Sequence, residues 1–161
     1  MNRKEKAKKI GNLLDELYPK TPVPLYHSSA YTLIVAVMLS AQTTDKKVNQ
    51  VTPSLFKVAD TPEKMRKLKI ETIQNHIKEI GLAPTKARNL KKMAQQLIDG
   101  GGVRPDWEYL ESLAGVGHKT ASVVMAQWYG IPAFPVDTHI HRLASRWGLS
   151  KAKNVDMTER D

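Results

Sequence analysis

A glycine turn followed by a lysine is the feature of this chain best suited to chemistry. The segment LAGVGHKTA (113–121) predicts a helix end, a tight turn containing Gly115 and Gly117, and a new helix start. Glycine tolerates positive φ and lets another backbone approach closely. The turn therefore predicts amides that face outward at a helix N-terminus, which is an anion site suited to phosphate. Lys119 lies just inside the new helix, where the helix dipole disfavours a cation.

Lys119 has two functional interpretations. It can pair with phosphate as a point charge, or it can attack as a neutral amine. A helix N-terminus and partial burial in a cleft both favour the neutral amine, and we expect both here. The ordinary alternative is a solvated lysine, one of 25 lysines and arginines in the chain. A nucleotide-binding P-loop is excluded, because its lysine directly follows glycine after a strand, whereas His118 intervenes here.

A carboxylate, Asp137, follows Pro135 and precedes an amphipathic stretch. Aspartate at such a position is a favoured helix N-cap, and we expect Asp137 to be one. Its catalytic role is an inference from its pairing with Lys119. A phosphate cradle, an amine and a carboxylate together indicate chemistry on a nucleic-acid backbone.

The composition favours a polyanionic partner. The net charge is +9, the isoelectric point is about 9.7, and 41% of the 161 residues are hydrophobic. This excess of positive charge steers polyanions, without distinguishing DNA from RNA or an acidic membrane. The absence of cysteine excludes disulfides and thiolate metal sites within this chain. We expect no bound metal, since His139 and His141 point to different faces of a helix.

No segment predicts export or membrane insertion. The basic residues 1–9 are not followed by the apolar core of a signal peptide, and the apolar run 31–41 is too short to span a bilayer. We therefore expect a cytoplasmic protein.

The hydrophobic periodicity is helical nearly everywhere, which predicts an all-α fold. A first helix ends before Pro19 and carries the stripe Ile10, Leu13, Leu14 and Leu17. Further helices are expected over 30–39, from 44 to beyond 55, from 61 to a stop at Gly81, over 84–98, 107–113, 118–129 and 138–147. In the helix that opens at Pro84, the spacing places Ala87, Leu90, Ala94, Leu97 and Ile98 inward, and Lys86, Arg88, Lys91 and Lys92 outward as a solvated face.

Four motifs give the chain a family resemblance. These are LAGVGHKTA (113–121), VDTHI (136–140), LSAQTTD (39–45) and IGL (80–82). In this order they resemble the endonuclease III family of helix-hairpin-helix DNA glycosylases, which also have lyase activity at abasic sites. The similarity extends from the N-terminal helix to about residue 154. The lysine distinguishes this pattern from that of relatives that cut only the glycosidic bond.

The resemblance implies roles for individual residues. The damaged nucleotide would be extruded from the duplex, and Lys119 would form a Schiff base with its sugar, assisted by Asp137. Amides around Gly115, Val116 and Gly117 would hold a DNA phosphate, with His118 and Thr120 beside it. Gln42 would fill the space left in the duplex and Leu82 would wedge into the opposite strand. Taken alone, Gln42 fits a solvated cap residue and Leu82 a hydrophobic contact at a helix stop.

The resemblance also implies a two-lobed fold. A helical barrel lobe would span 21–131, and residues 1–20 and 132–161 would form a second, incomplete lobe. Most family members carry a cysteine-ligated iron–sulfur cluster in a C-terminal part that we expect to be missing here, so the chain resembles a truncated member without this cofactor. The stripe on the first helix is then expected to lack its packing partner.

The expected function is therefore a bifunctional DNA glycosylase and abasic-site lyase for oxidised pyrimidines in base-excision repair. Its partner would be double-stranded DNA with damaged bases or abasic sites, and it would act as a nucleoid-associated monomer. Two alternatives stay open: a non-catalytic DNA-binding module, with the fragment inactive, and a monofunctional glycosylase.

Overall fold

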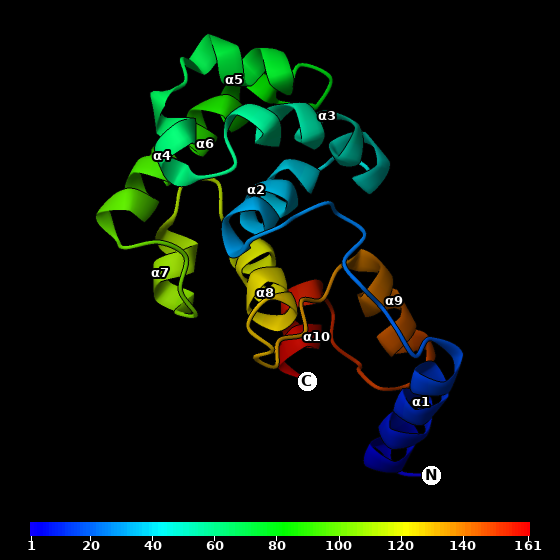
Figure 1. Ribbon diagram of the computed structural model, residues 1–161. Helices are drawn as coiled ribbons and strands as arrows, with labels where there is room; N and C mark the ends of the chain where they lie inside the picture. Colours follow the sequence, from blue (N-terminus) through cyan, green and yellow to red (C-terminus); the bar gives the residue numbers. More distant parts are fainter. The chain divides into compact units, whose positions relative to one another are not determined.

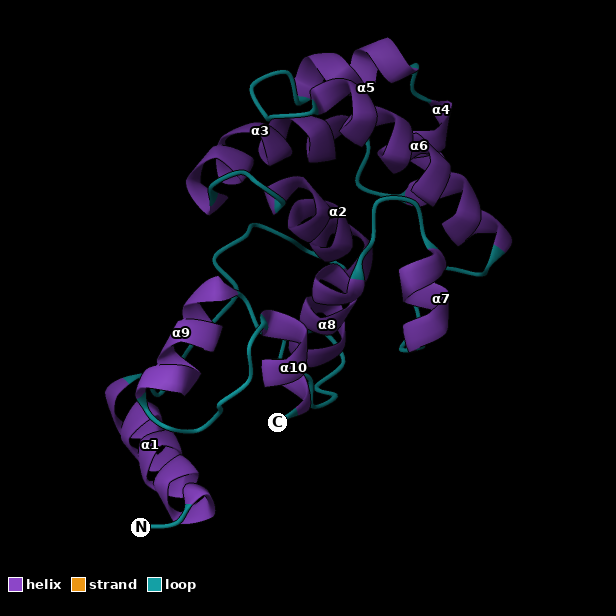
Figure 2. Cartoon of the chain, turned by 180° about the vertical axis from the view of Figure 1, so that it is seen from behind, coloured by secondary structure: helices purple, strands orange, loops and turns teal.

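The computed structural model describes residues 1–161, all of them in helices or connecting segments (Figure 1). The helices are α1 (Arg3–Leu17), α2 (Ala30–Ser40), α3 (Asp45–Val58), α4 (Pro62–Lys67), α5 (Ile70–His76), α6 (Ala83–Asp99), α7 (Trp107–Ser112), α8 (His118–Gln127), α9 (Thr138–Arg146) and α10 (Val155–Arg160). Figure 2 shows that only loops and turns connect them. None has both the length and the apolar character that a membrane crossing requires. The predicted all-α class is confirmed.

The chain divides into two compact units. The larger comprises Pro24–Ala133, and the smaller combines Met1–Val23 with Phe134–Asp161. From the sequence we predicted these boundaries between residues 20 and 21 and between residues 131 and 132.

Side chains at the N-termini fix where most helices begin. Each of these caps accepts a hydrogen bond from an amide of the first turn: Asn2, Ser29, Thr44, Thr61, Asp106, Asp137 and Asn154. A cap of this kind typically contributes about 1 kcal/mol to helix stability. The predicted capping role of Asp137 is confirmed, because its Oδ1 accepts from the amide of Ile140 at 2.8 Å.

The core of the larger unit forms around α2. Residues 31–39 are all buried, and both α3 and α8 pack against this helix. A helix that is apolar all round must be covered on every side, which agrees with the buried helix predicted over 30–39. The helices α4 and α5 pack against α6.

The segment from Thr61 to Gly81 differs from its prediction. It forms two short helices, α4 and α5, with extended backbone at Leu68 and Lys69 between them. The Lys91 ammonium, on α6, donates to the carbonyls of Arg66 and Leu68 and so satisfies the end of α4. Ile73, Ile77 and Ile80, which recur at roughly helical spacing along this segment, are all buried. Gly81 is not the helix stop, because α5 ends at His76.

The smaller unit has little buried surface in its helices. Neither α1 nor α9 has a buried residue. The predicted stripe on α1 is largely open to solvent, with Leu13 52% and Leu17 59% exposed. The helices α9 and α10 are joined by a 2.7 Å hydrogen bond between His141 Nδ1 and Thr158 Oγ1.

Candidate functional site

The glycine turn forms between α7 and α8 as the sequence predicts. Gly115 adopts a φ of +79°, and Gly117 is the extended residue before α8, where it offers no side-chain cap. The first hydrogen bond of α8 runs from the Ala121 amide to the Gly117 carbonyl, at 3.0 Å. The amides of Lys119 and Thr120 precede it. The N-terminus of α8 therefore retains unpaired donors, which together with the helix dipole suit an anion.

One expectation about these amides changes. The Val116 amide donates to the Leu113 carbonyl at 3.1 Å and closes the turn, so it is not available to a phosphate. The Val116 side chain is buried and anchors the turn instead. The amides of Gly115 and Gly117 have no acceptor within the chain, and they remain the candidates for an anion.

Close packing holds the turn against α2 and α6. A Cβ added at Gly115 would lie 2.6 Å from Met38 Sδ, which is closer than such contacts allow, and 3.1 Å from Asn89 Cβ, which is tighter than most. Gln96 on α6 adds a polar clamp: its Oε1 accepts from the Ala114 amide at 2.8 Å, and its Nε2 donates to the Ser112 carbonyl at 3.1 Å. The turn is therefore fixed on the rigid part of the larger unit.

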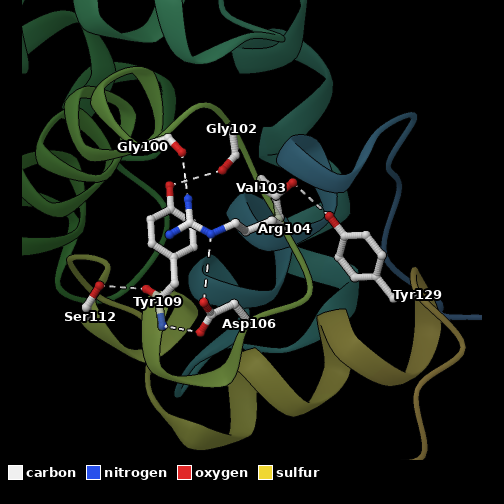
Figure 3. Close-up of polar contacts among 8 residues, drawn as sticks. All are labelled: Gly100, Gly102, Val103, Arg104, Asp106, Tyr109, Ser112 and Tyr129. Carbon is white, nitrogen blue, oxygen red and sulfur yellow. Dashed lines mark hydrogen bonds and ion pairs between the residues drawn. The ribbon is translucent and has the colours of Figure 1, made fainter.

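A second network fixes α7 from the loop that precedes it (Figure 3). The Tyr109 hydroxyl donates to the Gly102 carbonyl at 3.0 Å, and the Arg104 guanidinium lies 3.5 Å from the centre of the Tyr109 ring. Arg104 also donates to the Gly100 carbonyl at 2.6 Å. Tyr129, beyond α8, donates to the Val103 carbonyl at 2.8 Å. The loop therefore connects both helices that flank the glycine turn (Figure 3).

Lys119 lies in the first turn of α8 and its side chain is exposed. The expectation that it is partly buried is wrong, because Lys119 belongs to the exposed residues of the chain. Its ammonium forms no hydrogen bond and no ion pair. Lys119 is consequently available to a ligand at the same helix end as the unpaired amides.

The two residues on either side of Lys119 are held by protein groups. His118 Nδ1 lies 2.6 Å from Glu111 Oε1, and its ring stacks on Trp107 with centroids 5.6 Å apart. Thr120 is buried, with 9% of its surface exposed. His118 therefore has a fixed orientation beside the turn, while the Thr120 side chain belongs to the core and only its amide is directed to the helix end.

Gln42 and Leu82 share an unusual backbone conformation. Their φ values are +58° and +61°, and no other non-glycine residue of the chain has positive φ. This conformation costs on the order of 1–3 kcal/mol for such residues and is concentrated at functional sites. The Leu82 side chain is 59% exposed, which rules out the hydrophobic contact at a helix stop. Gln42 is exposed and is not a helix cap, since Thr44 caps α3.

Lys86 corrects the predicted solvated face of α6. Only 6% of its surface is exposed, and its Nζ donates to the carbonyls of Leu39 at 2.9 Å and Ala41 at 2.8 Å. Burial lowers the pKa of this ammonium below its usual 10.5. The sequence contained a signal for this: buried positions of α6 recur at helical spacing, and residue 86 belongs to that set. The three other cations, Arg88, Lys91 and Lys92, line an open hollow of about 660 Å³ with Arg66.

Asp137 belongs to the smaller unit. Its Oδ1 accepts from the Ile140 amide, and its other carboxylate oxygen has no hydrogen-bond partner. A carboxylate with one oxygen fixed and one available is suited to stabilising a cation or accepting a proton.

Sequence reasoning missed Lys86, Gln96 and Glu111, which position the residues it identified. Gln96 and Glu111 gave no recognisable signal, because polar residues on helix faces are ordinarily solvated. The residues present do not fit a cysteine-ligated cluster, since the chain has no cysteine. It also has no group of three or more histidine, aspartate or glutamate side chains placed to hold a metal.

Comparisons with known proteins agree on one family. Residues 35–161 match the model of the HhH-GPD superfamily of base excision DNA repair proteins. The chain is 45% identical to endonuclease III of Treponema pallidum over 160 residues, which cover 96% of this chain and 76% of that protein. It is 42% identical to endonuclease III of Escherichia coli, with 96% of this chain and 75% of that protein covered.

Solved structures support the same relationship. A trapped endonuclease III–DNA covalent intermediate superimposes with a TM-score of 0.90 at 36% identity, over 99% of this chain and 76% of that one. A thermostable thymine-DNA glycosylase, at 24% identity and a TM-score of 0.83, shares the fold.

Proposed function

The chain belongs to the endonuclease III family of helix-hairpin-helix base excision DNA repair proteins, and we propose that it is a DNA glycosylase with abasic-site lyase activity. The single observation that carries this proposal is Lys119. Its amine is exposed and unpaired in the first turn of an uncapped helix. An exposed lysine with no partner in the protein can reach the sugar of a bound nucleotide, and a lysine attacks such a carbon as the neutral amine.

The proposed reaction begins at the sugar of an extruded nucleotide. The Lys119 nitrogen forms a bond to the anomeric carbon while the bond to the base breaks and its electron pair leaves with the base. The departing base takes up a proton, and the attached nitrogen loses one of its own. The bond between the anomeric carbon and the ring oxygen then breaks, that oxygen takes up a proton, and a protonated Schiff base remains. Removal of a proton from the neighbouring carbon then expels the phosphate on the 3′ side. Nucleophilic catalysis of this kind divides one difficult step into two easier ones.

The surrounding residues have distinct proposed roles. The Gly115 and Gly117 amides hold a phosphate, and His118, fixed by Glu111, lies beside it. Asp137 accepts a proton or stabilises the cationic sugar, for which its unpaired oxygen is suited. Gln42 and Leu82 enter the duplex, and their insertion offsets the few kcal/mol that unstacking costs per step.

The substrate class we propose is duplex DNA with oxidised pyrimidines or abasic sites, bound by a monomer in the cytoplasm at the nucleoid. The net charge of +9 supports a polyanionic partner. Support for DNA comes from the similarity to an endonuclease III trapped covalently on DNA.

Borohydride reduction tests the proposal. The purified chain is incubated with an abasic duplex and borohydride, and covalent complexes are separated by denaturing electrophoresis. We expect a covalent complex that Lys119→Gln abolishes and that Lys92→Gln, an exposed lysine on α6, retains. Salt-sensitive binding without any complex would support the DNA-binding module. On a duplex that carries an oxidised pyrimidine, base release without strand cleavage would support a monofunctional glycosylase.

A further inference from the structure

Lys86 reaches from α6 across to the end of α2. Its Nζ donates to two backbone carbonyls, Leu39 O and Ala41 O, and lies 3.4 Å from the Thr43 hydroxyl. These three acceptors surround the turn that presents Gln42. Lys86 is itself in the first turn of α6, where its amide donates to the Leu82 carbonyl at 2.9 Å. Lys86 therefore contacts the backbone of both turns: its side chain binds the turn that presents Gln42, and its amide binds the carbonyl of Leu82.

The Lys86 ammonium also supplies a positive charge at the C-terminus of α2, where that helix has none of its own. The last turn of α2 has no basic residue of its own, and a cation near the final carbonyls of a helix is favourable. The Lys86 ammonium occupies that place from another helix. No carboxylate pairs with it, so its charge is balanced by carbonyl dipoles alone.

A buried lysine is a costly way to stabilise a fold. Removing an ammonium from water is unfavourable unless hydrogen bonds replace the lost hydration, and an apolar side chain of similar volume often stabilises a protein as well or better. The position on the apolar face of α6 could have held such a side chain. A lysine there is explained by a requirement for geometry, since its donors determine where the carbonyls of the turn must lie.

We propose that Lys86 is a positioning residue that joins the Gln42 turn to the Leu82 turn, so that the two side chains enter the duplex as one rigid unit. This inference rests on the proposed function. It does not involve the reacting atoms, and the hydrogen bonds of the Lys86 ammonium go to Leu39, Ala41 and Thr43 rather than to Lys119. Its effect should therefore be confined to opening a stacked duplex.

The test compares two substrates. Borohydride trapping rates are measured on an abasic site in a duplex and on the same strand alone, which needs no opening. We expect Lys86→Met to reduce trapping on the duplex about tenfold or more and to change it less than about twofold on the single strand. Lys92→Met removes the same charge from an exposed site on the same helix and should leave the ratio unchanged. Equal loss on both substrates would show a merely structural role and overturn the proposal.

A double-mutant comparison isolates the connection. If Lys86 acts through the two turns, adding Lys86→Met to the Gln42→Ala, Leu82→Ala double variant should cause little further loss on the duplex, because coupled residues are not additive. An additive loss would contradict the proposal. Should Lys86→Met fail to fold, Lys86→Gln keeps an N–H donor and takes its place in both experiments, with an intermediate ratio expected.

A binding measurement separates this proposal from the proposed function. A fluorescent base analogue is placed beside a stable abasic-site mimic in a duplex, where unstacking raises its emission. Wild-type protein should raise the emission at saturation, and Lys86→Met should not, whether or not Lys119 forms a covalent bond. Equal emission with both proteins would overturn the role of Lys86, while absence of trapping alone would overturn only the lyase.

Discussion

At the scale of single residues, Gln42, Leu82 and Lys86 form a group that sequence motifs only partly revealed. The motifs identified the first two, which both adopt strained backbone. Strain must be compensated by the surroundings, and the Lys86 hydrogen bonds to the adjacent turn are such a compensation. The residue that supports the pair was predicted to face solvent, because a lysine among other cations on a helix is ordinarily exposed.

The burial of Lys86 has a consequence for pH dependence. Burial lowers its pKa in the folded state, whereas in the unfolded chain it keeps the usual 10.5. Between these two values the unfolded chain binds more protons, so the free energy of unfolding contributed by this group rises with pH. We expect wild-type protein to gain stability relative to Lys86→Met as the pH approaches 10.5 from below. Urea denaturation across this range measures the difference, and a difference independent of pH would contradict the expectation.

At the scale of elements, the α7–α8 turn is the part of the site whose geometry the sequence predicted best. Two glycines one residue apart, between helical stretches, allowed few conformations. The structure adds the reason for Gly115, where a side chain would contact Met38 and Asn89. The unpaired amides at the start of α8 then follow from the absence of a capping side chain at Gly117.

The two glycines should differ in their tolerance of alanine. At Gly115, positive φ and the contacts with Met38 and Asn89 predict that alanine lowers the free energy of unfolding by about 2 kcal/mol. At Gly117, negative φ and open space predict a change within about 0.5 kcal/mol. Chemical denaturation of the two variants gives the comparison. Equal losses would show that the turn does not depend on close packing at Gly115.

The segment between Thr61 and Gly81 shows the limit of periodicity. Ile73, Ile77 and Ile80 recur at roughly helical spacing and are buried, yet the segment is not one helix but breaks at Leu68 and Lys69. The break is satisfied by Lys91, on a helix that comes later in the chain. The residues of this segment do not indicate that Lys91 will bind the end of α4. The local sequence therefore could not predict two helices in place of one.

At the scale of the whole molecule, the two proposed reacting groups lie in different units, on helices that differ in how many residues they bury. Lys119 lies in the first turn of a helix with five buried residues, whereas Asp137 caps a helix with none. Helices with few buried contacts open at lower free energy.

We expect the amides of α9 to exchange with deuterium faster than those of α8. The measurement is hydrogen exchange of the native protein resolved by segment. The α2 amides, all in a buried helix, serve as the slow reference within the same sample. Equal protection of α8 and α9 would contradict the expectation that Asp137 is held less firmly than Lys119.

The sequence by itself determined the helical class, the Asp137 cap, the glycine turn and the four motifs that establish the family. These depend on residues within a few positions of one another, where periodicity and turn chemistry act directly. The roles of Lys86 and Gln96 were decided only by tertiary structure. Lys86 bonds a carbonyl 47 positions earlier in the chain, and Gln96 accepts from an amide 18 positions later. A side chain's partner at such separations depends on how helices pack, and a single sequence does not specify it.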